Sequence, residues 1–494
     1  MDWGPGSVAV ERVLWLPPFG ASFRVDALAI VMAVLAGYLT LSAGLFAGGY
    51  LTGGARSQGR FRAWLTAFVG ACLGVVLSAD WLTFLVFWEL LTLVVYSLLC
   101  YSDKKAALRY CAVQVAGAGV LSVGIARLYV ETGSLVMGPV PGHLAPFFVV
   151  GIGVKAGLLG LHFWLPDVHS KAPAPVSSLL SGYVVKLGAY ALIRISAGSD
   201  GFILWVGGLM ALYGVVFALL QHDAKRLLAY HTVSQVGYIV AAIGAGSEFA
   251  LAAAACHMVT HALFKGLLFL SIGAVESDFG TRDLRFLGGV GRLKASTFAM
   301  FLVGAVAIAG LPGTSGFASK VMMKYAVESH NAISFALMAA GVGTAVSFAK
   351  LAFFVFFGDT KRPADGGMLN GVHPGVSELA RSSGMLMLAA ATVFMGFRPG
   401  TLPAFLGVPA PPFFTSGNVV AALVTVLAGL LGFAAFKGVL YPKPKNVPDI
   451  DRLTDAMVEG LALVSSVLQA AHNGSARFYA FWTIAAVIVL LCVL

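Results

Sequence analysis

The sequence predicts an all-α polytopic membrane protein, and three observations support this fold class. Of its 494 residues, 59% are hydrophobic and only 11% are charged, and the mean hydropathy is +0.88. A soluble domain carries roughly 25% charged residues, so this chain could not cover a soluble surface. Apolar runs of about 20 residues, the length that a helix needs to cross a bilayer core, recur from end to end. These features exclude a soluble enzyme, a nucleic-acid binder and a disulfide scaffold.

The apolar runs predict about fourteen transmembrane helices. The run at 296–328 is too long for one straight helix and contains Leu311-Pro312-Gly313. Because proline and paired glycines break a helix, we expect one discontinuous helix there. The run at 145–163 shows no comparable break, although its glycines would permit one. The predicted crossings are 26–49, 61–79, 82–101, 107–130, 145–163, 174–196, 202–220, 229–246, 249–275, 296–328, 332–357, 381–397, 417–437 and 477–494.

The basic residues predict how the chain lies in a cell (inner) membrane. One set of alternate loops carries most of the Lys and Arg residues, whereas the other holds only Arg12, Arg24 and Arg398. The positive-inside rule places the first set in the cytoplasm and both termini outside. The net charge of +10 then reflects topology and contact with lipid. Residues 449–472 are amphipathic, which predicts either a helix on the interface or a simple tether for the last crossing.

Ionisable residues inside the apolar runs are the candidate functional residues. A charge near the bilayer centre costs at least about 2.5–3.5 kcal/mol on insertion scales, so each one requires a reason. Lys155, Lys186, Lys265 and Lys320 all lie within predicted crossings, but Glu89 is the single deep carboxylate available to them. Static pairing cannot neutralise all four lysines. A hydrated internal channel in which lysines exchange protons is the more economical interpretation.

Two histidines extend this set. His257, His261 and Lys265 follow one another at a spacing of four residues, which places them in one stripe along a helix. Buried lysine and histidine are both able to exchange protons near neutral pH. Together with Glu89 and the other lysines, they predict a proton relay across the membrane. The secondary candidates are His162, His231 and Lys350, and for Lys350 a structural role near the cytoplasmic end of its helix is favoured.

Other chemistry has little support in the sequence. The segment from His257 to His261 has the histidine spacing of a zinc protease but lacks the glutamate after the first histidine. The five cysteines lie in apolar stretches without C-x-x-C spacing, which favours packing over metal or redox roles. Phosphate-binding, dinucleotide-binding and haem-attachment motifs are not found. We therefore expect this chain to bind no cofactor or metal and to contain no catalytic residue; whether its complex is an enzyme stays open.

Several motifs follow one another between residues 16 and 360. They are LPPFG at 16–20, HFWLPDVH at 162–169, APAPVS at 172–177, KLGAY at 186–190, DAKRLLAYHTVSQVG at 223–237, HMVTHALFKGLLFLSIG at 257–273 and GLPGTSGFASK at 310–320. In this order they resemble the antiporter-like, proton-translocating membrane subunits of respiratory complex I, of Mrp cation/proton antiporters and of membrane-bound hydrogenases.

The resemblance implies a fold and a division of the chain. It implies two inverted repeats of five helices, each with one broken helix at its centre. The repeats would occupy 61–196 and 202–357, after an N-terminal span and loop at 1–60 and before C-terminal spans at 358–494.

The resemblance also implies roles. Glu89 and Lys155 would serve one half-channel, Lys186 and the histidine stripe the middle, and Lys265 with Lys320 the other half. The chain would move H+ as one subunit of a larger complex with other membrane subunits, and it would bind no nucleic acid. Two alternatives stay open. One is a subunit of an Mrp-type Na+/H+ antiporter, and the other is a gradient-coupling subunit of a bicarbonate-accumulating two-component enzyme complex.

Overall fold

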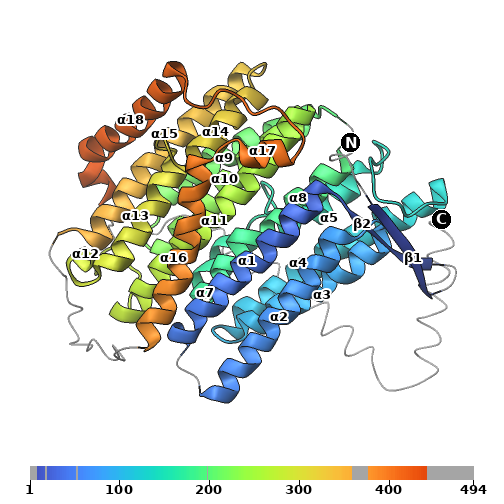
Figure 1. Cartoon of the computed structure of the whole chain (residues 1–494), viewed down its shortest axis with the longest axis horizontal. Coiled ribbons are helices and arrows are strands. Elements are labelled where there is room, and N and C mark those ends of the chain that lie inside the picture. Colours follow the sequence, from blue (N-terminus) through green and yellow to red (C-terminus); the bar gives the residue numbers. More distant parts are fainter. Residues whose placement is uncertain (1–7, 17–18, 52–53, 197, 359–375, 442–494) are drawn as a thin grey trace.

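The computed structural model describes residues 8–16, 19–51, 54–196, 198–358 and 376–441. Within these ranges, eleven helices are long and apolar enough to cross a membrane, which confirms a helical polytopic membrane protein. The long helices lie side by side along one common direction (Figure 1). The predicted amphipathic helix 449–472 and the last predicted crossing, 477–494, lie outside the described residues.

The elements follow the predicted spans closely. A π-helical turn at Leu180–Val184 joins α7 to α8 without interrupting the span. The elements are β1 (Val8–Leu16), β2 (Phe19–Val25), α1 (Ala27–Tyr50), α2 (Ala55–Leu77), α3 (Trp81–Leu99), α4 (Lys104–Thr132), α5 (Ala145–Ala156), α6 (Trp164–Lys171), α7 (Ala174–Leu179), α8 (Val185–Ile195), α9 (Gly201–Leu220), α10 (Ala224–Ala245), α11 (Glu248–Phe279), α12 (Val290–Leu293), α13 (Ala295–Ala309), α14 (Ser315–Ala326), α15 (Asn331–Phe356), α16 (Val376–Phe397), α17 (Thr401–Phe405) and α18 (Ser416–Leu440).

A β-hairpin precedes the first helix and is not among the predicted elements. Its strands β1 and β2 are antiparallel, with Val8 opposite Val25. The Asp80 carboxylate attaches the hairpin to the start of α3, since it accepts hydrogen bonds from the Ser22 amide at 2.8 Å and from the Ser22 hydroxyl at 2.6 Å. The same carboxylate caps α3 through the Thr83 amide at 2.8 Å. The hairpin therefore forms between two helix ends rather than within a span.

The predicted continuous crossing at 145–163 is wrong. Helix α5 ends at Ala156, because Gly157 adopts a left-handed conformation (φ +69°) and its amide bonds to the carbonyls of Gly153 and Val154. Residues 158–163 then form turns, and the chain continues as α6. Glycine adopts this backbone conformation without steric cost. The break therefore lies immediately after Lys155, which is in the last turn of α5.

The predicted break in the run 296–328 is confirmed. Helix α13 ends at Ala309, where Gly310 is left-handed (φ +85°), and α14 begins at Ser315 with Thr314 as its cap. Lys320 lies in the second turn of α14. Irregular backbone at membrane depth is tolerated only where protein or a water-filled cavity surrounds it. Each break thus has a lysine close to it in the sequence, Lys155 before the first break and Lys320 after the second.

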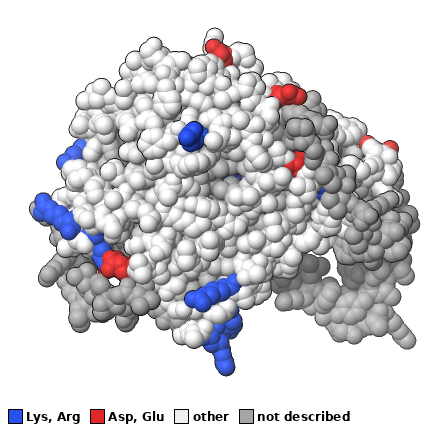
Figure 2. Space-filling model, in the orientation of Figure 1, with Lys and Arg blue, Asp and Glu red and all other residues white. Residues whose placement is uncertain are grey.

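The centre of the bundle is completely buried. The apolar windows of the span 174–195, of α10 and of α11 are fully buried, whereas those of α1, α3 and α9 are half-buried. Figure 1 shows α10 and α11 enclosed by the surrounding helices. Figure 2 shows a face with few charged side chains, most of them toward its edges, as expected of a surface that contacts lipid. The three central spans are therefore shielded from lipid by the other helices.

Candidate functional site

The predicted relay residues lie in the interior of this bundle. Lys155, Lys186, His257, His261 and Lys265 are fully buried. Lys320 and Glu89 are partly buried. The structure thus places all seven residues on helices that surround or form the central spans, and their contacts show which of them lie close together.

A threonine connects the first acidic and basic residues. On α3, Thr92 follows Glu89 by three residues, and its hydroxyl lies 3.5 Å from Glu89 Oε1. The ammonium of Lys155 donates to the Thr92 hydroxyl at 3.0 Å and also lies 4.5 Å from the centroid of the Trp88 ring. Glu89 and Lys155, both described residues, form no direct ion pair in this structure. Their charges are linked through one hydroxyl, which sequence spacing does not reveal.

Backbone carbonyls, rather than carboxylates, hold the other buried lysines. Lys320 donates to Ile308 O at 2.6 Å, a carbonyl that the end of α13 leaves free. Lys186 donates to the carbonyl of Ser181 in the π-helical turn. Lys265 donates to Leu228 O of α10 at 2.5 Å. Within the described ranges, none of these lysines has a carboxylate partner.

A carbonyl partner affects a buried lysine differently from a carboxylate partner. A carbonyl offers only a partial negative charge, and the ends of helices supply such carbonyls without an intrahelical partner. A lysine held in this way keeps its position whether or not it carries its third proton. A carboxylate partner would instead bind the charged form firmly and would itself remain as an unpaired charge after proton loss. Carbonyl-bound lysines are therefore suited to repeated proton exchange.

The histidine stripe connects the centre of the bundle to the second broken helix. The rings of His257 and His261 are nearly parallel, with an angle of 9° and 5.9 Å between centroids. His257 Nδ1 lies 2.9 Å from the hydroxyl of Ser319 on α14, immediately before Lys320. The ring of Tyr238 lies 5.8 Å from both the His257 centroid and the Lys320 ammonium. His257 is thus the end of the stripe that approaches Lys320.

Lys265 is at the opposite end of the stripe. It lies two turns beyond His257 on α11, between the rings of Phe269 and Phe348. Lys186 is close enough to interact electrostatically with Lys265 and with both histidines of the stripe. Along α11 the order is therefore Lys265, His261 and His257, with Lys186 near all three.

The secondary candidates separate into two kinds. Lys350 donates to Leu219 O at 2.7 Å and to Gln221 O at 2.8 Å, the carbonyls at the end of α9. His162 lies in the break after α5, with its ring 4.8 Å from that of Tyr213. His231 is on α10, with its ring 5.0 Å from that of Phe348. The His231 imidazole has no hydrogen-bond partner among the described protein groups.

Four further polar residues belong to this interior and are absent from the predicted set. Thr92 and Ser319 are the bridging hydroxyls described above. His169 is fully buried and stacked on Phe269 at 5.1 Å. Gln235 is fully buried on α10, one turn after His231, and neither atom of its amide has a protein partner in the described chain. His169 could have been selected from the sequence as a histidine in a quoted motif, but hydroxyls and amides carry no comparable signal.

The sequence matches one protein family and several known membrane subunits. Residues 78–347 match the family model described as "NADH:quinone oxidoreductase/Mrp antiporter, TM". The chain is 37% identical over 332 residues to NADH-quinone oxidoreductase subunit N of Desulforudis audaxviator, an alignment that covers 62% of this chain and 66% of that protein. It is 31% identical over 382 residues to a Na+/H+ antiporter subunit of Alkalihalophilus pseudofirmus, covering 72% of this chain and 77% of the relative.

The fold also matches a solved structure. A chain of the Mrp complex from Dietzia sp. DQ12-45-1b superposes with a TM-score of 0.78 at 24% identity, covering 99% of this chain and 57% of that one. At this identity the match supports the arrangement of the helices alone.

Proposed function

Since the chain belongs to the NADH:quinone oxidoreductase/Mrp antiporter family of membrane subunits, we propose that it translocates protons as one subunit of a multi-subunit membrane complex. The observation that carries this proposal is the set of buried lysines held by carbonyls and by one threonine hydroxyl. In the described part of the chain these four lysines have no carboxylate within ion-pair distance, and a buried charge without an opposite charge beside it is costly, which favours groups that can lose their proton.

The order of contacts suggests the route. Protonation would begin at Glu89 and Lys155, pass to Lys186, and continue through Lys265, His261 and His257 to Lys320. In this proposed route the histidines lie between Lys265 and Lys320, whereas the family resemblance implies that they belong to the middle of the route with Lys186. His261 and His231 are buried imidazoles without a hydrogen-bond partner among the described residues. They fit a route completed by water, because buried polar groups otherwise keep hydrogen bonds.

The proposed mechanism is a switch at the first pair. When Thr92 connects Glu89 to Lys155, the carboxylate stabilises the charged lysine. Separation of the pair would remove that stabilisation, and Lys155 would release its proton toward Lys186. The following residues would pass on one proton each, since each ammonium or imidazole disfavours a second charge nearby.

We also propose the finer architecture. The two broken helices, α5–α6 and α13–α14, would each be the centre of one five-helix inverted repeat, at 61–196 and 202–357. The flanking segments would be 1–60 and 358–494, and the total would be about fourteen crossings with an outside N-terminus. The break after Lys155 and the break before Lys320 support this symmetry.

Replacement of one central lysine tests the transport proposal. In inside-out vesicles that contain the complete native complex, Lys265→Ala should leave assembly intact but abolish proton movement followed with a pH-sensitive dye. Lys437→Ala is the matched control, because Lys437 is exposed in the last turn of α18 and lies over the ring of Phe353, away from the relay. Normal proton movement by an assembled Lys265→Ala complex would contradict the proposal.

Sodium/proton exchange is the second candidate function. The relative of which 77% is covered is named a Na+/H+ antiporter subunit, and carboxylate and carbonyl oxygens are hard ligands that can bind Na+ as well as hold an ammonium. The same vesicles distinguish the two functions. Proton movement that requires added Na+ would favour exchange, whereas Na+-independent movement would favour a proton pump.

A further inference from the structure

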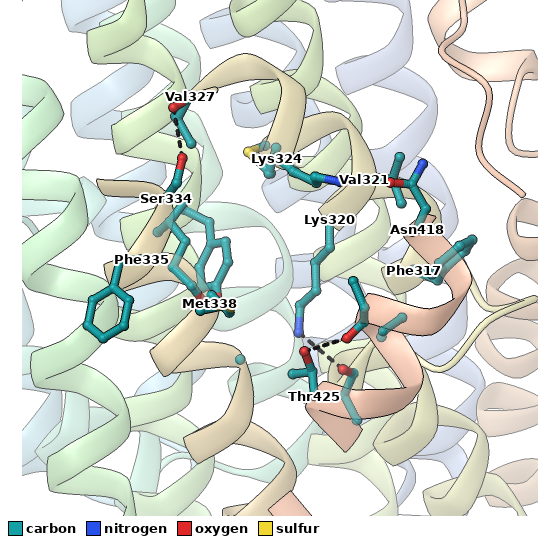
Figure 3. Close-up of a pocket in the computed structure, with 18 residues that line it drawn as sticks. Phe317, Lys320, Val321, Lys324, Val327, Ser334, Phe335, Met338, Asn418 and Thr425 are labelled. Carbon is teal, nitrogen blue, oxygen red and sulfur yellow. Dashed lines mark hydrogen bonds between the residues drawn. The ribbon is translucent and has the colours of Figure 1, made fainter. Parts of the chain in front are cut away.

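A cavity of about 390 Å³ lies beside the terminal lysine of the proposed relay, between α14, α15 and α18. Its walls are mostly apolar, and Phe335 and Met338 at its rim are 66% and 56% exposed. Figure 3 shows these two side chains on one wall and Lys320 extending into the space toward Thr425. The cavity therefore opens on an apolar surface of the kind that faces lipid, so an apolar molecule could enter it from the bilayer.

Two ammonium groups give this apolar cavity a positive charge. Lys320 and Lys324 are one turn apart on α14, a spacing that places side chains on the same face. Lys324 donates to Asn418 Oδ1 at 3.1 Å, and Lys320 donates to Ile308 O at 2.6 Å (Figure 3 labels both lysines). Neither has a carboxylate partner within the part of the chain that is described. An ammonium has three protons to donate, so both lysines retain donors for an anion.

Size and chemistry together define the ligand. Sites for small molecules are apolar cavities of roughly 300–1,000 Å³ with a few polar groups that fix orientation, and this cavity is near the lower limit. That volume suits a single acyl chain better than a two-chain phospholipid. We propose that the cavity binds a long-chain fatty acid, with its carboxylate between Lys320 and Lys324 and its chain along Phe335 and Met338.

A consequence for transport rests on the proposed function. A carboxylate beside Lys320 would hold that lysine in its charged form and occupy the donors by which it exchanges protons. The bound fatty acid would therefore inhibit proton movement at the last step of the relay. Binding itself does not depend on the relay, so the two claims can fail separately.

The binding test uses a long-chain fatty acid that carries a photoactivatable group near its methyl end. The complete native complex in nanodiscs is irradiated with this probe, and the cross-linked peptides are identified by mass spectrometry. We expect labelling on α15 or α18 near the cavity that unlabelled fatty acid prevents and its methyl ester does not. Lys324→Gln should weaken competition by about 10-fold or more, the loss expected for one hydrogen bond between charged groups. Lys437→Gln, on an exposed turn of α18, is the control.

Several outcomes would overturn the proposal. These are no labelling at the cavity, equal competition by the methyl ester, and stronger labelling by a photoactivatable phosphatidylglycerol, which would make a phospholipid phosphate the occupant. Lys324→Gln could weaken labelling through the loss of charge alone. Ala422→Phe therefore serves as a second variant, because it fills the cavity without changing its charge. Unchanged labelling of Ala422→Phe would also refute the site. Specific labelling without inhibition of proton movement would retain the binding site and contradict the relay.

Discussion

Removal of the Thr92 hydroxyl tests the link between Glu89 and Lys155. Thr92→Val preserves the branched shape of a fully buried side chain and deletes only the group that bonds Lys155 at 3.0 Å. The ring of Trp88, whose centroid lies 4.5 Å from the ammonium, is unchanged in this variant. The position of Lys155 should therefore change little, while its communication with Glu89 is lost.

The expected loss of proton movement in Thr92→Val follows from the type of hydrogen bond that is removed. A bond to a charged group contributes about 1.5–3 kcal/mol, which corresponds to about 10- to 100-fold in an equilibrium constant. The hydroxyl accepts from Lys155 and has one proton, which it donates either to Trp88 O of its own helix at 3.1 Å or to Glu89 Oε1 at 3.5 Å. We expect proton movement by the assembled complex to fall by about this factor, and Thr92→Ser, which restores the hydroxyl, to recover most of it.

The assay compares dye-detected proton movement per assembled complex in inside-out vesicles. Thr344→Val is the matched control. Thr344 is equally buried, but among the described residues its hydroxyl bonds only the Ala340 carbonyl of its own helix, at 2.7 Å. Equal activities of Thr92→Val and Thr344→Val would refute the role of the hydroxyl. A double variant with Glu89→Gln adds a second check, since residues in one network should give non-additive losses.

The remaining predictions concern the framework that positions the relay. Gly316→Ala would drive a Cβ into the carbonyl oxygen of Ala307, so the two halves of the broken helix must separate. We expect a destabilisation of about 1–3 kcal/mol, measured as a lower Tm. Gly119→Ala is the control, because a Cβ there meets open space and should not destabilise the protein. Arg194→Met would remove the bonds of 2.7 and 2.8 Å to the buried Asp26 carboxylate. Among the described groups, the carboxylate would keep only Arg24 at 3.3 Å and the Ala29 amide at 2.9 Å. We expect a loss of about 1.5–3 kcal/mol, and a wild-type Tm would contradict this. Burial acts to raise the pKa of Asp26, but the hydrogen bonds and charge of Arg194 lower it below its ordinary 3.8. The pair should therefore stabilise the protein at neutral pH, and this contribution should disappear as the pH falls below 3.8 through the lowered pKa, an acid dependence that Asp26→Asn should lack and that acid titration of the Tm measures.

Hydropathy alone determined the class of this protein and most of its spans. A transmembrane helix satisfies its backbone hydrogen bonds within one segment, so about 20 consecutive apolar residues suffice to predict it. The break before Lys320 was equally local, because the segment Leu311 to Gly313 contains proline and glycine. The cost of a charge in a bilayer likewise selected the lysines, Glu89 and the histidine stripe without knowledge of their neighbours.

The partners of those residues were decided by the tertiary structure. The break after Lys155 lacks a proline and depends on the left-handed backbone of Gly157. The hydroxyl of Thr92 lies between Glu89 and Lys155 only because α3 and α5 bring residues 63 positions apart into contact. The carbonyls that hold Lys186, Lys265 and Lys320 belong to a π-helical turn, a neighbouring helix and a helix end. Sequence periodicity reports which residues share a face of one helix, whereas the packing of helices determines which backbone group meets each ammonium.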